Sequence, residues 1–215
     1  MIKQLLLFLC TGFLCLSSLM AQETKKAPAG LGFEAGMGYN MLTLQGKSLA
    51  GNDTTVFYKR FWMQPCIRLH YDIKIKDFSG GRSTLKVKTF LGYYAFGGKA
   101  KMSDIGEYDI VSLSSIEAGA GLSFDIIEMV QISPLIKGQY VFAASERYIR
   151  ETPKPSTDIK DQTNLFSYNA GLQLRFKYKH FAIAAEGWYG LADIHKDKNK
   201  TAKENNFRLL LGYEF

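Results

Sequence analysis

Hydrophobic and polar residues alternate without interruption along residues 166–178, FSYNAGLQLRFKY. The even positions, from Phe166 to Tyr178, are all apolar or aromatic, whereas the odd positions, from Ser167 to Lys177, are polar or glycine. Successive side chains of a β-strand point to opposite faces of the sheet. This period of two therefore predicts a strand with one apolar face and one polar face.

Seven further segments alternate in a similar way. Together the eight predicted strands cover residues 31–43, 61–75, 84–96, 111–125, 130–142, 166–178, 181–191 and 207–215. Most of them have roughly eleven to fifteen residues, whereas strands of globular proteins usually have about five or six. Because a tilted strand needs about nine to eleven residues to cross a membrane, these strands are long enough to span one.

The connections between the predicted strands alternate in length. Short links are expected near residues 76–83, 126–129 and 178–181, and longer ones near 45–58, 97–110, 146–163 and 193–206. Short turns at one end and long loops at the other are typical of outer-membrane barrels. We therefore predict an all-β, eight-stranded antiparallel up-and-down transmembrane β-barrel, located in the outer membrane with its N- and C-termini on the periplasmic, short-turn side.

A soluble β-sandwich is the alternative fold. The composition, with 13% aromatic residues, 20 glycines and 5 prolines, fits either architecture. However, a sandwich would not need an apolar face on every long strand opposite a charged face. Aromatic residues also lie toward both ends of the predicted strands, as they do in the girdles of membrane barrels. The pattern favours the barrel.

The N-terminus has the order of a secretory signal peptide. Lys3 precedes an apolar stretch from Leu5 to Leu19, and small or flexible residues follow up to Ala21. This predicts a signal peptide over residues 1–21, a mobile leader over 22–29 and the barrel domain over 30–215. An uncleaved membrane anchor is the competing interpretation, but fifteen apolar residues are short for a span. After cleavage Cys66 is the only cysteine, so no internal disulfide can form.

The polar face of the strands would line the barrel interior. An eight-stranded barrel is just wide enough to be filled by its own side chains, and charges buried there must pair with one another. We therefore predict a lumenal charge network that closes the barrel, with a narrow ion path as the alternative. Its predicted members are Glu34, Arg68, Asp72, Lys88, Glu117, Lys137, Arg175, Glu186 and Arg208, with Lys74, Lys86, Lys177 and Glu214 on the same face.

The sequence shows no grouping of residues that indicates catalysis. The three histidines, His70, His180 and His195, are expected at different levels of the barrel, so a shared metal site is not predicted. Some eight-stranded barrels modify lipid A with a serine, a histidine and an acidic residue. Here no serine and no acidic residue are recognisably clustered with His195. Cys66 is interpreted as a small lumenal filler. We predict no catalytic, cofactor-binding or metal-binding residue, and no cofactor.

Charge limits the choice of partners. The net charge is +7, but an exported chain is not expected to bind nucleic acid. The loop from His195 to Asn206 carries four lysines and two acids. It is interpreted as a solvated loop, with attraction to lipopolysaccharide phosphates as the alternative.

The first strand, GLGFEAGMGYNML, and the last strand, FRLLLGYEF, carry a resemblance to a known group. The chain resembles the small outer-membrane β-barrel proteins of Bacteroidota, a broad family with OmpX-like, OmpA-barrel-like and PorT-like members. The resemblance implies folding by the outer-membrane assembly machinery, with Tyr213 and Phe215 in the assembly signal. It also implies lipid and lipopolysaccharide as surroundings.

The expected function is that of a small, monomeric, closed and non-catalytic barrel with a structural or surface-interaction role, whose outer loops contact a surface or host ligand. A narrow porin-like channel, a PorT-like secretion accessory and a lipid A-modifying enzyme are the alternatives.

Overall fold

The structure is a computed structural model that describes residues 30–47, 53–60, 64–78, 83–101, 108–127, 129–149, 155–197 and 200–215. The predicted signal peptide and leader, residues 1–29, lie outside the described residues.

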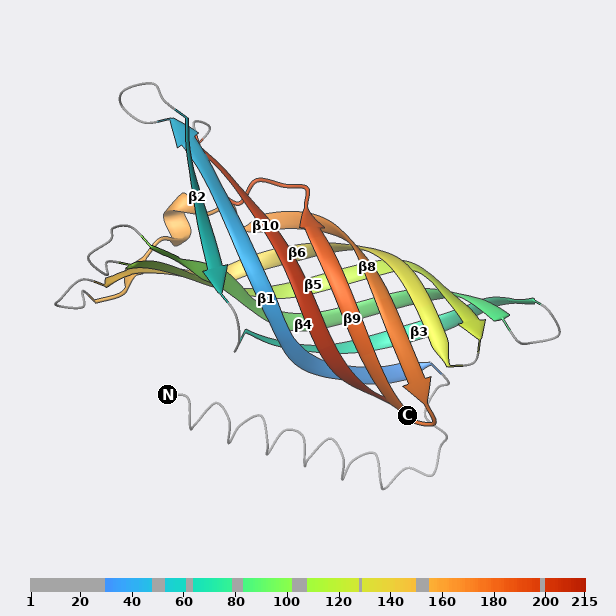
Figure 1. Cartoon of the computed structure of the whole chain (residues 1–215). Helices are drawn as coiled ribbons and strands as arrows, with labels where there is room; N and C mark the ends of the chain where they lie inside the picture. Colours follow the sequence, from blue (N-terminus) through green and yellow to red (C-terminus); the bar gives the residue numbers. More distant parts are fainter. Residues whose placement is uncertain are drawn as a thin grey trace.

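Ten strands and one short 3₁₀ helix make up the described chain (Figure 1). They are β1 (Leu31–Lys47), β2 (Asp53–Arg60), β3 (Pro65–Phe78), β4 (Ser83–Lys101), β5 (Tyr108–Ile127), β6 (Val130–Ile149), β7 (Thr157–Asp158), η2 (Lys160–Gln162), β8 (Phe166–Tyr178), β9 (Phe181–Gly190) and β10 (Lys200–Glu214).

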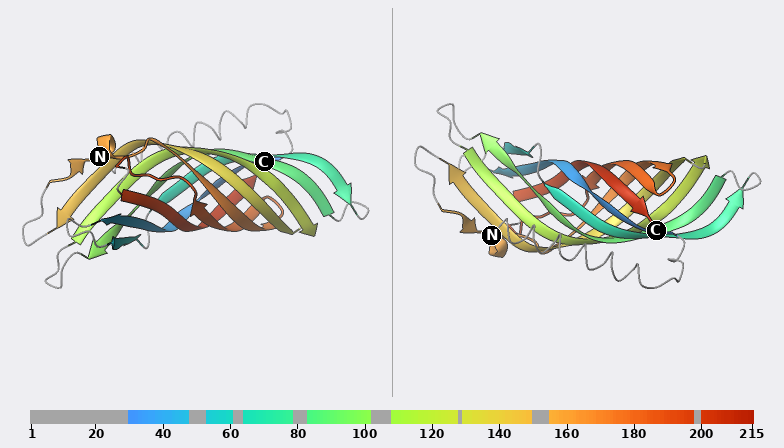
Figure 2. Two further views of the ribbon diagram at one scale, coloured as in Figure 1. Left: turned by 90° about the horizontal axis from the view of Figure 1, so that it is seen from above. Right: turned by 90° about the horizontal axis from the view of Figure 1, so that it is seen from below.

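The strands close into a ring of eight antiparallel positions. The order β1-β10-β9-β8-β6-β5-β4-β3 returns to β1 through the pairing of β3 with residues 31–37. β2 pairs with residues 40–47 of β1, so β2 and β3 together occupy the second position of the ring. Figures 1 and 2 show the strands inclined around one common axis. The predicted fold class, an eight-stranded antiparallel barrel, is confirmed.

The outer surface of the ring carries a belt of exposed apolar side chains. Ile136 and Leu211 expose 66% and 67% of their surface, and every strand position of the ring carries at least one large apolar side chain that is more than half exposed. A continuous apolar surface of this kind is unfavourable in water and favourable in lipid. The belt includes Met37, Leu69, Leu91, Ile116, Leu122, Ile136, Leu172, Leu174, Ile183, Leu209 and Leu211.

Aromatic residues border the belt. Phe166, Tyr168 and Tyr189 are exposed toward the end that carries the long connections, and Tyr178 and Phe181 toward the short-turn end. Such girdles lie at the two lipid–water interfaces of membrane barrels. No helix among the described residues is long and apolar enough to cross a membrane.

The strands reach further at the long-loop end than the sequence predicted. Residues 97–101 and 108–110 are strand, as are 53–58 and 200–206, although all were expected in loops. Here the alternation is inverted, because Leu42, Leu113 and Ala202 point inward and are buried, while Gln45 and Lys99 are exposed. The apolar face therefore lies outside within the belt and inside where the barrel extends beyond it. Because the strands were predicted from outward apolar residues, their predicted ends fall at the edge of the belt.

A β-bulge in β6 also changes which sequence positions face inward. Ser114 pairs with Ala143 and Ser115 with Val141, which leaves Phe142 without a partner. Inward-facing residues are therefore odd-numbered up to Val141 and include the even-numbered Ala144 beyond it. A bulge re-aims the following side chains in this way.

Candidate functional site: the charged lumen

The barrel interior at the level of the belt is filled by eight charged side chains, which we call the charged plug. Its members come from β1, β3, β4, β5, β6, β8, β9 and β10 and are at most 3% exposed. They are Glu34, Arg68, Lys88, Glu117, Lys137, Arg175, Glu186 and Arg208.

Arg68 connects two acids of the plug. Its Nε donates to Glu34 Oε2 at 2.6 Å, and its guanidinium donates to both oxygens of Glu186, with Nη1 at 3.2 Å from Oε2. Gln173 Nε2 and Trp188 Nε1 also donate to Glu186, each at 2.9 Å. Glu186 therefore accepts bonds from β3, β8 and its own strand, which is the satisfaction that a buried carboxylate requires.

Arg208 forms the second centre of the plug. Its Nη1 and Nη2 donate to the two oxygens of Glu117 at 2.7 and 2.9 Å, a bidentate pair, and Lys137 Nζ donates to the same carboxylate at 2.9 Å. The guanidinium lies 3.5 Å from the ring centre of Tyr94. Cys66, fully buried, contacts both charges. The thiol is a lumenal filler in this geometry.

Glycine provides the space that these long side chains occupy. A Cβ on Gly92 would collide with the Cβ of Arg68 and with the carbonyl oxygen of Ile67. Gly92 lies directly opposite Arg68 in the β3–β4 ladder. The sequence pattern of glycines on the polar face is thus explained at this position by close packing against an arginine.

The charges toward the short-turn end form a second, more open group. Lys86 and Lys177 pair with Asp125 at 2.8 and 3.1 Å, and Gln131 donates to Asp125 and to Asp72. The prediction for Lys74 was wrong, because its side chain is 60% exposed and pairs with Asp77. A register irregularity between Lys74 and Lys76 disturbs the alternation of β3 at this point.

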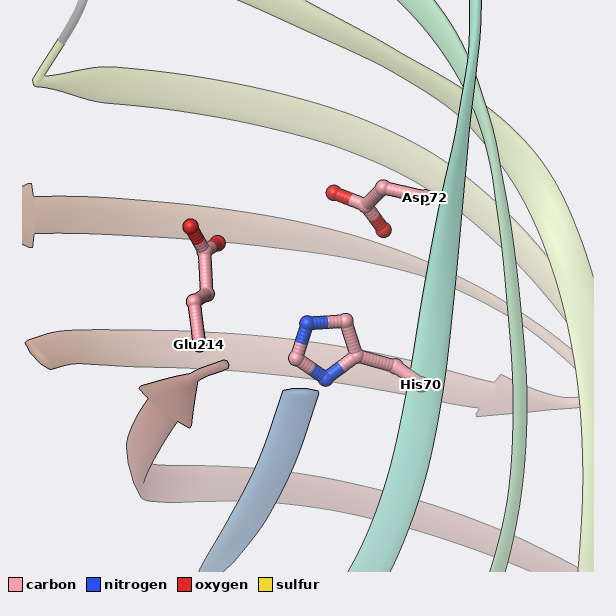
Figure 3. A group of neighbouring side chains, drawn as sticks. All are labelled: His70, Asp72 and Glu214. Atoms are coloured by element: carbon pink, nitrogen blue, oxygen red, sulfur yellow. The ribbon is translucent and has the colours of Figure 1, made fainter. Parts of the chain in front are cut away.

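One cluster at this end has the composition of a metal site. His70 and Asp72 from β3 and Glu214 from β10 offer ligand atoms within 4.8 Å of one another (Figure 3). His70 Nδ1 and Asp72 Oδ1 are buried without a hydrogen-bond partner among the described residues. One imidazole and two carboxylates suit a divalent transition metal. In the sequence, only the i, i+2 spacing of His70 and Asp72, which places both on one face of a strand, could have indicated this cluster. Glu214 lies close to them only because the last strand pairs with the first.

Arg175 already occupies the cation position of this cluster. Its Nη1 lies 2.8 Å from Glu214 Oε1 and 3.2 Å from His70 Nε2. A metal ion bound there would meet a guanidinium that cannot lose its charge. The other two histidines do not join the cluster, since His180 contacts the backbone of Glu214 from a turn and His195 pairs with Thr163 at the long-loop end.

The long-loop end of the interior was missed by the sequence analysis. It contains a buried apolar cluster that includes Leu42, Phe96, Val111, Leu113, Ile194 and Ala202. Tyr58 donates to Asp109 Oδ2 at 2.9 Å beside this cluster. Glu146 lies in the part of β6 beyond the belt and its bulge, where burial, followed by the hydrogen bond and charge of Asp109, raises its pKa to about 7.

The closed ring, the apolar belt with its aromatic borders and the polar interior define an outer-membrane β-barrel of eight strands. Among solved structures, the chain is similar to Ail, the attachment invasion locus protein of Yersinia pestis, at 16% identity and a TM-score of 0.45, over 87% of this chain and 100% of Ail. It is also similar to Neisserial surface protein A, at 16% identity and a TM-score of 0.42, over 87% of this chain and 98% of that one.

A third similar structure is the outer membrane protease OmpT from Escherichia coli, at 10% identity and a TM-score of 0.44, over 90% of this chain and 100% of OmpT. No protein-family profile matches the chain, and no curated protein is similar to it in sequence.

Proposed function

We propose that this chain is a closed, non-catalytic barrel with a structural or surface-interaction role in the outer membrane. The observation that supports a closed lumen is the charged plug, in which each of the eight strand positions contributes a fully or almost fully buried ionisable side chain. A continuous water path would need space at the level of the belt, where Arg68 and Arg208 reach acids on other strands. An eight-stranded barrel has little space left once such side chains fill it.

The absence of catalysis is part of the proposal. Within the described residues, the only group of three metal-ligating side chains already holds the Arg175 guanidinium. His195 has its backbone N–H bonded to Asp193, and its Nδ1 accepts from the backbone of Asp197. We expect the lipid A mass spectrum of the host membrane to be the same with and without the protein, and a new acylation pattern would contradict this part.

The proposal also covers the orientation of the barrel in the membrane and its assembly. Both ends of the barrel domain lie at the short-turn end, where Gly32 pairs with Glu214, so we propose that they face the periplasm. Tyr213 packs edge-on against Phe181 and Phe215 there. We propose that Tyr213 and Phe215 belong to the assembly signal, in lipid and lipopolysaccharide surroundings, and that the protein is a monomer. Membership of the Bacteroidota family and an outer-loop ligand are likewise proposed.

Conductance in planar lipid bilayers tests the closed lumen. We expect the purified protein to give no stable conductance steps. The double variant Arg208→Ser with Glu117→Ser removes the bidentate pair and should produce steps, because it opens space and leaves Lys137 without its acid. Leu172→Ala, on the outer surface, is the matched control and should stay silent. Steps from the unmodified protein would overturn the closed-barrel proposal in favour of a channel.

A further inference from the structure

The long-loop end of the lumen contains a cavity that the charged plug does not use. Its volume is about 210 Å³, and its lining comes from β1, β2, β5, β6, η2, β10 and the segment before β10. We propose that this cavity binds a small amphipathic cation, an amine attached to an apolar body of about the size of one benzene ring. The proposal goes beyond the closed-barrel function, which requires no ligand.

The wall of the cavity is largely apolar. Seven of its lining residues are aliphatic, namely Leu42, Leu44, Val111, Leu113, Ile159, Ile194 and Ala202. Most of them belong to the buried apolar cluster, so they are held in place by packing. An apolar cavity of about 150 Å³ is already large enough to bind benzene. The space here therefore accommodates one ring and a short side chain.

The polar groups at the cavity favour a positive charge. Glu146 lines it, and Asp109 lies behind Tyr58, only 5% exposed. Asp109 Oδ1 has no hydrogen-bond donor among the described residues. Lys200 is the one lining lysine in the described chain and is itself exposed at the rim.

Glu146 lies beside Asp109 and lines the cavity itself. At pH 8, above its pKa of about 7, Glu146 is ionised next to Asp109, and the two acids leave a deficit of positive charge there. An ammonium group supplies up to three donors and would bond to Glu146, the carboxyl that lines the cavity. An anionic ligand would instead add a third negative charge beside Asp109 and Glu146. A metal ion is disfavoured, because the described residues place their one group of three possible metal ligands at the opposite end of the barrel.

Calorimetric titration of the detergent-solubilised full chain with 2-phenylethylamine at pH 8 tests the proposal. The neutral isostere 2-phenylethanol and the anion phenylacetate serve as comparison ligands. We expect saturable binding of the amine in the millimolar range or below, weaker binding of the alcohol and none of the acid. Glu146→Gln should weaken amine binding about tenfold or more, because it removes a charged hydrogen bond.

Two further variants separate the cavity from its surroundings. Ala202→Leu adds carbon atoms into the cavity and should reduce binding of the amine and the alcohol alike while the barrel stays folded on a detergent gel. Asp161→Asn removes an exposed acid of η2 at the same end and should leave binding unchanged. No saturable binding, or equal amine binding by the unmodified protein, Glu146→Gln and Ala202→Leu, would overturn the proposal. Neither result would bear on conductance, so the closed-barrel function is tested separately.

Discussion

At the scale of single residues, Arg208 shows how a charge is accommodated inside the barrel. Its guanidinium makes two bonds to Glu117, its Nε donates to Asn206 at 3.1 Å, and its plane stacks on Tyr94. Removing a charge from water costs several kcal/mol, which only such a complete set of partners offsets. The residue is therefore stable in the lumen only together with its neighbours.

Glu186 tests this dependence. The substitution Glu186→Gln keeps the side-chain volume but removes one of the two acids paired with Arg68, so that only Glu34 remains. We expect the free energy of unfolding to fall, by at most about 3–5 kcal/mol in a dry site. Urea titration of the protein refolded in lipid vesicles measures it. Glu214→Gln is the matched control at the rim, where the acid side chain is 29% exposed, and should cost less.

In a mutant cycle, adding Arg68→Leu should recover part of the loss from Glu186→Gln, because the cation that has lost one of its two acids is then removed as well. If Glu186→Gln leaves the stability unchanged and the variant conducts ions, the lumen contains a water-filled ion path.

At the scale of elements, single strands carry two different environments in series. On the outward face of β10, Phe207, Leu209 and Leu211 are exposed in the belt, whereas the same face continues as Lys203 and Asn205 toward the long-loop end. On the inward face the order is reversed, with Arg208 in the plug and Ala202 in the apolar cluster. The change of side follows from the change of solvent, from lipid around the belt to water around the extension.

Arginine substitutions along this one face test the position of the membrane. Leu209→Arg places a charge within the belt and should destabilise the protein by about 2–4 kcal/mol. Asn205→Arg, four residues along the same face of the strand, should cost about 0–1 kcal/mol. Urea unfolding in lipid vesicles gives both values. Equal costs would mean that the hydrocarbon boundary does not lie between these two residues.

At the scale of the whole molecule, the barrel is held by ladder closure and by two different fillings. The β1–β10 pairing joins the ends of the barrel domain over residues 32–46 and 200–214. The plug fills the part surrounded by lipid, and the apolar cluster fills the extension. At the level of the belt, closure leaves no edge among the described strands, which is the condition for a sheet to be stable in a bilayer.

This architecture predicts how the protein behaves as a unit. It should fractionate with outer membranes, resist extraction by urea and migrate faster unboiled than boiled on a detergent gel, because a closed ring keeps its compact shape until heat opens it. A soluble β-barrel would be recovered from the periplasm after osmotic shock, and recovery there would contradict the membrane assignment.

The sequence by itself determined which residues face lipid and which face the lumen within the belt. Leu172 is exposed and Gln173 is buried as the alternation predicted, and all nine predicted lumenal charges lie inside. This was possible because the side-chain period of a strand is a local property of the chain. Within the predicted strands the alternation failed at Lys74, where the register of β3 is irregular. Phe142 is exposed as predicted, and the bulge there shifts the alternation only beyond the predicted end of that strand.

Only the tertiary structure decided which charges meet. Arg68 and Glu186 are 118 residues apart, and the contact of Glu214 with His70 and Arg175 depends on how the last strand closes onto the first. The apolar filling of the extension and its cavity also come from residues of several strands that are distant in sequence. Strand order, stagger and bulges determine which side chains come into contact. These features are global properties of a closed ring rather than properties of any one segment.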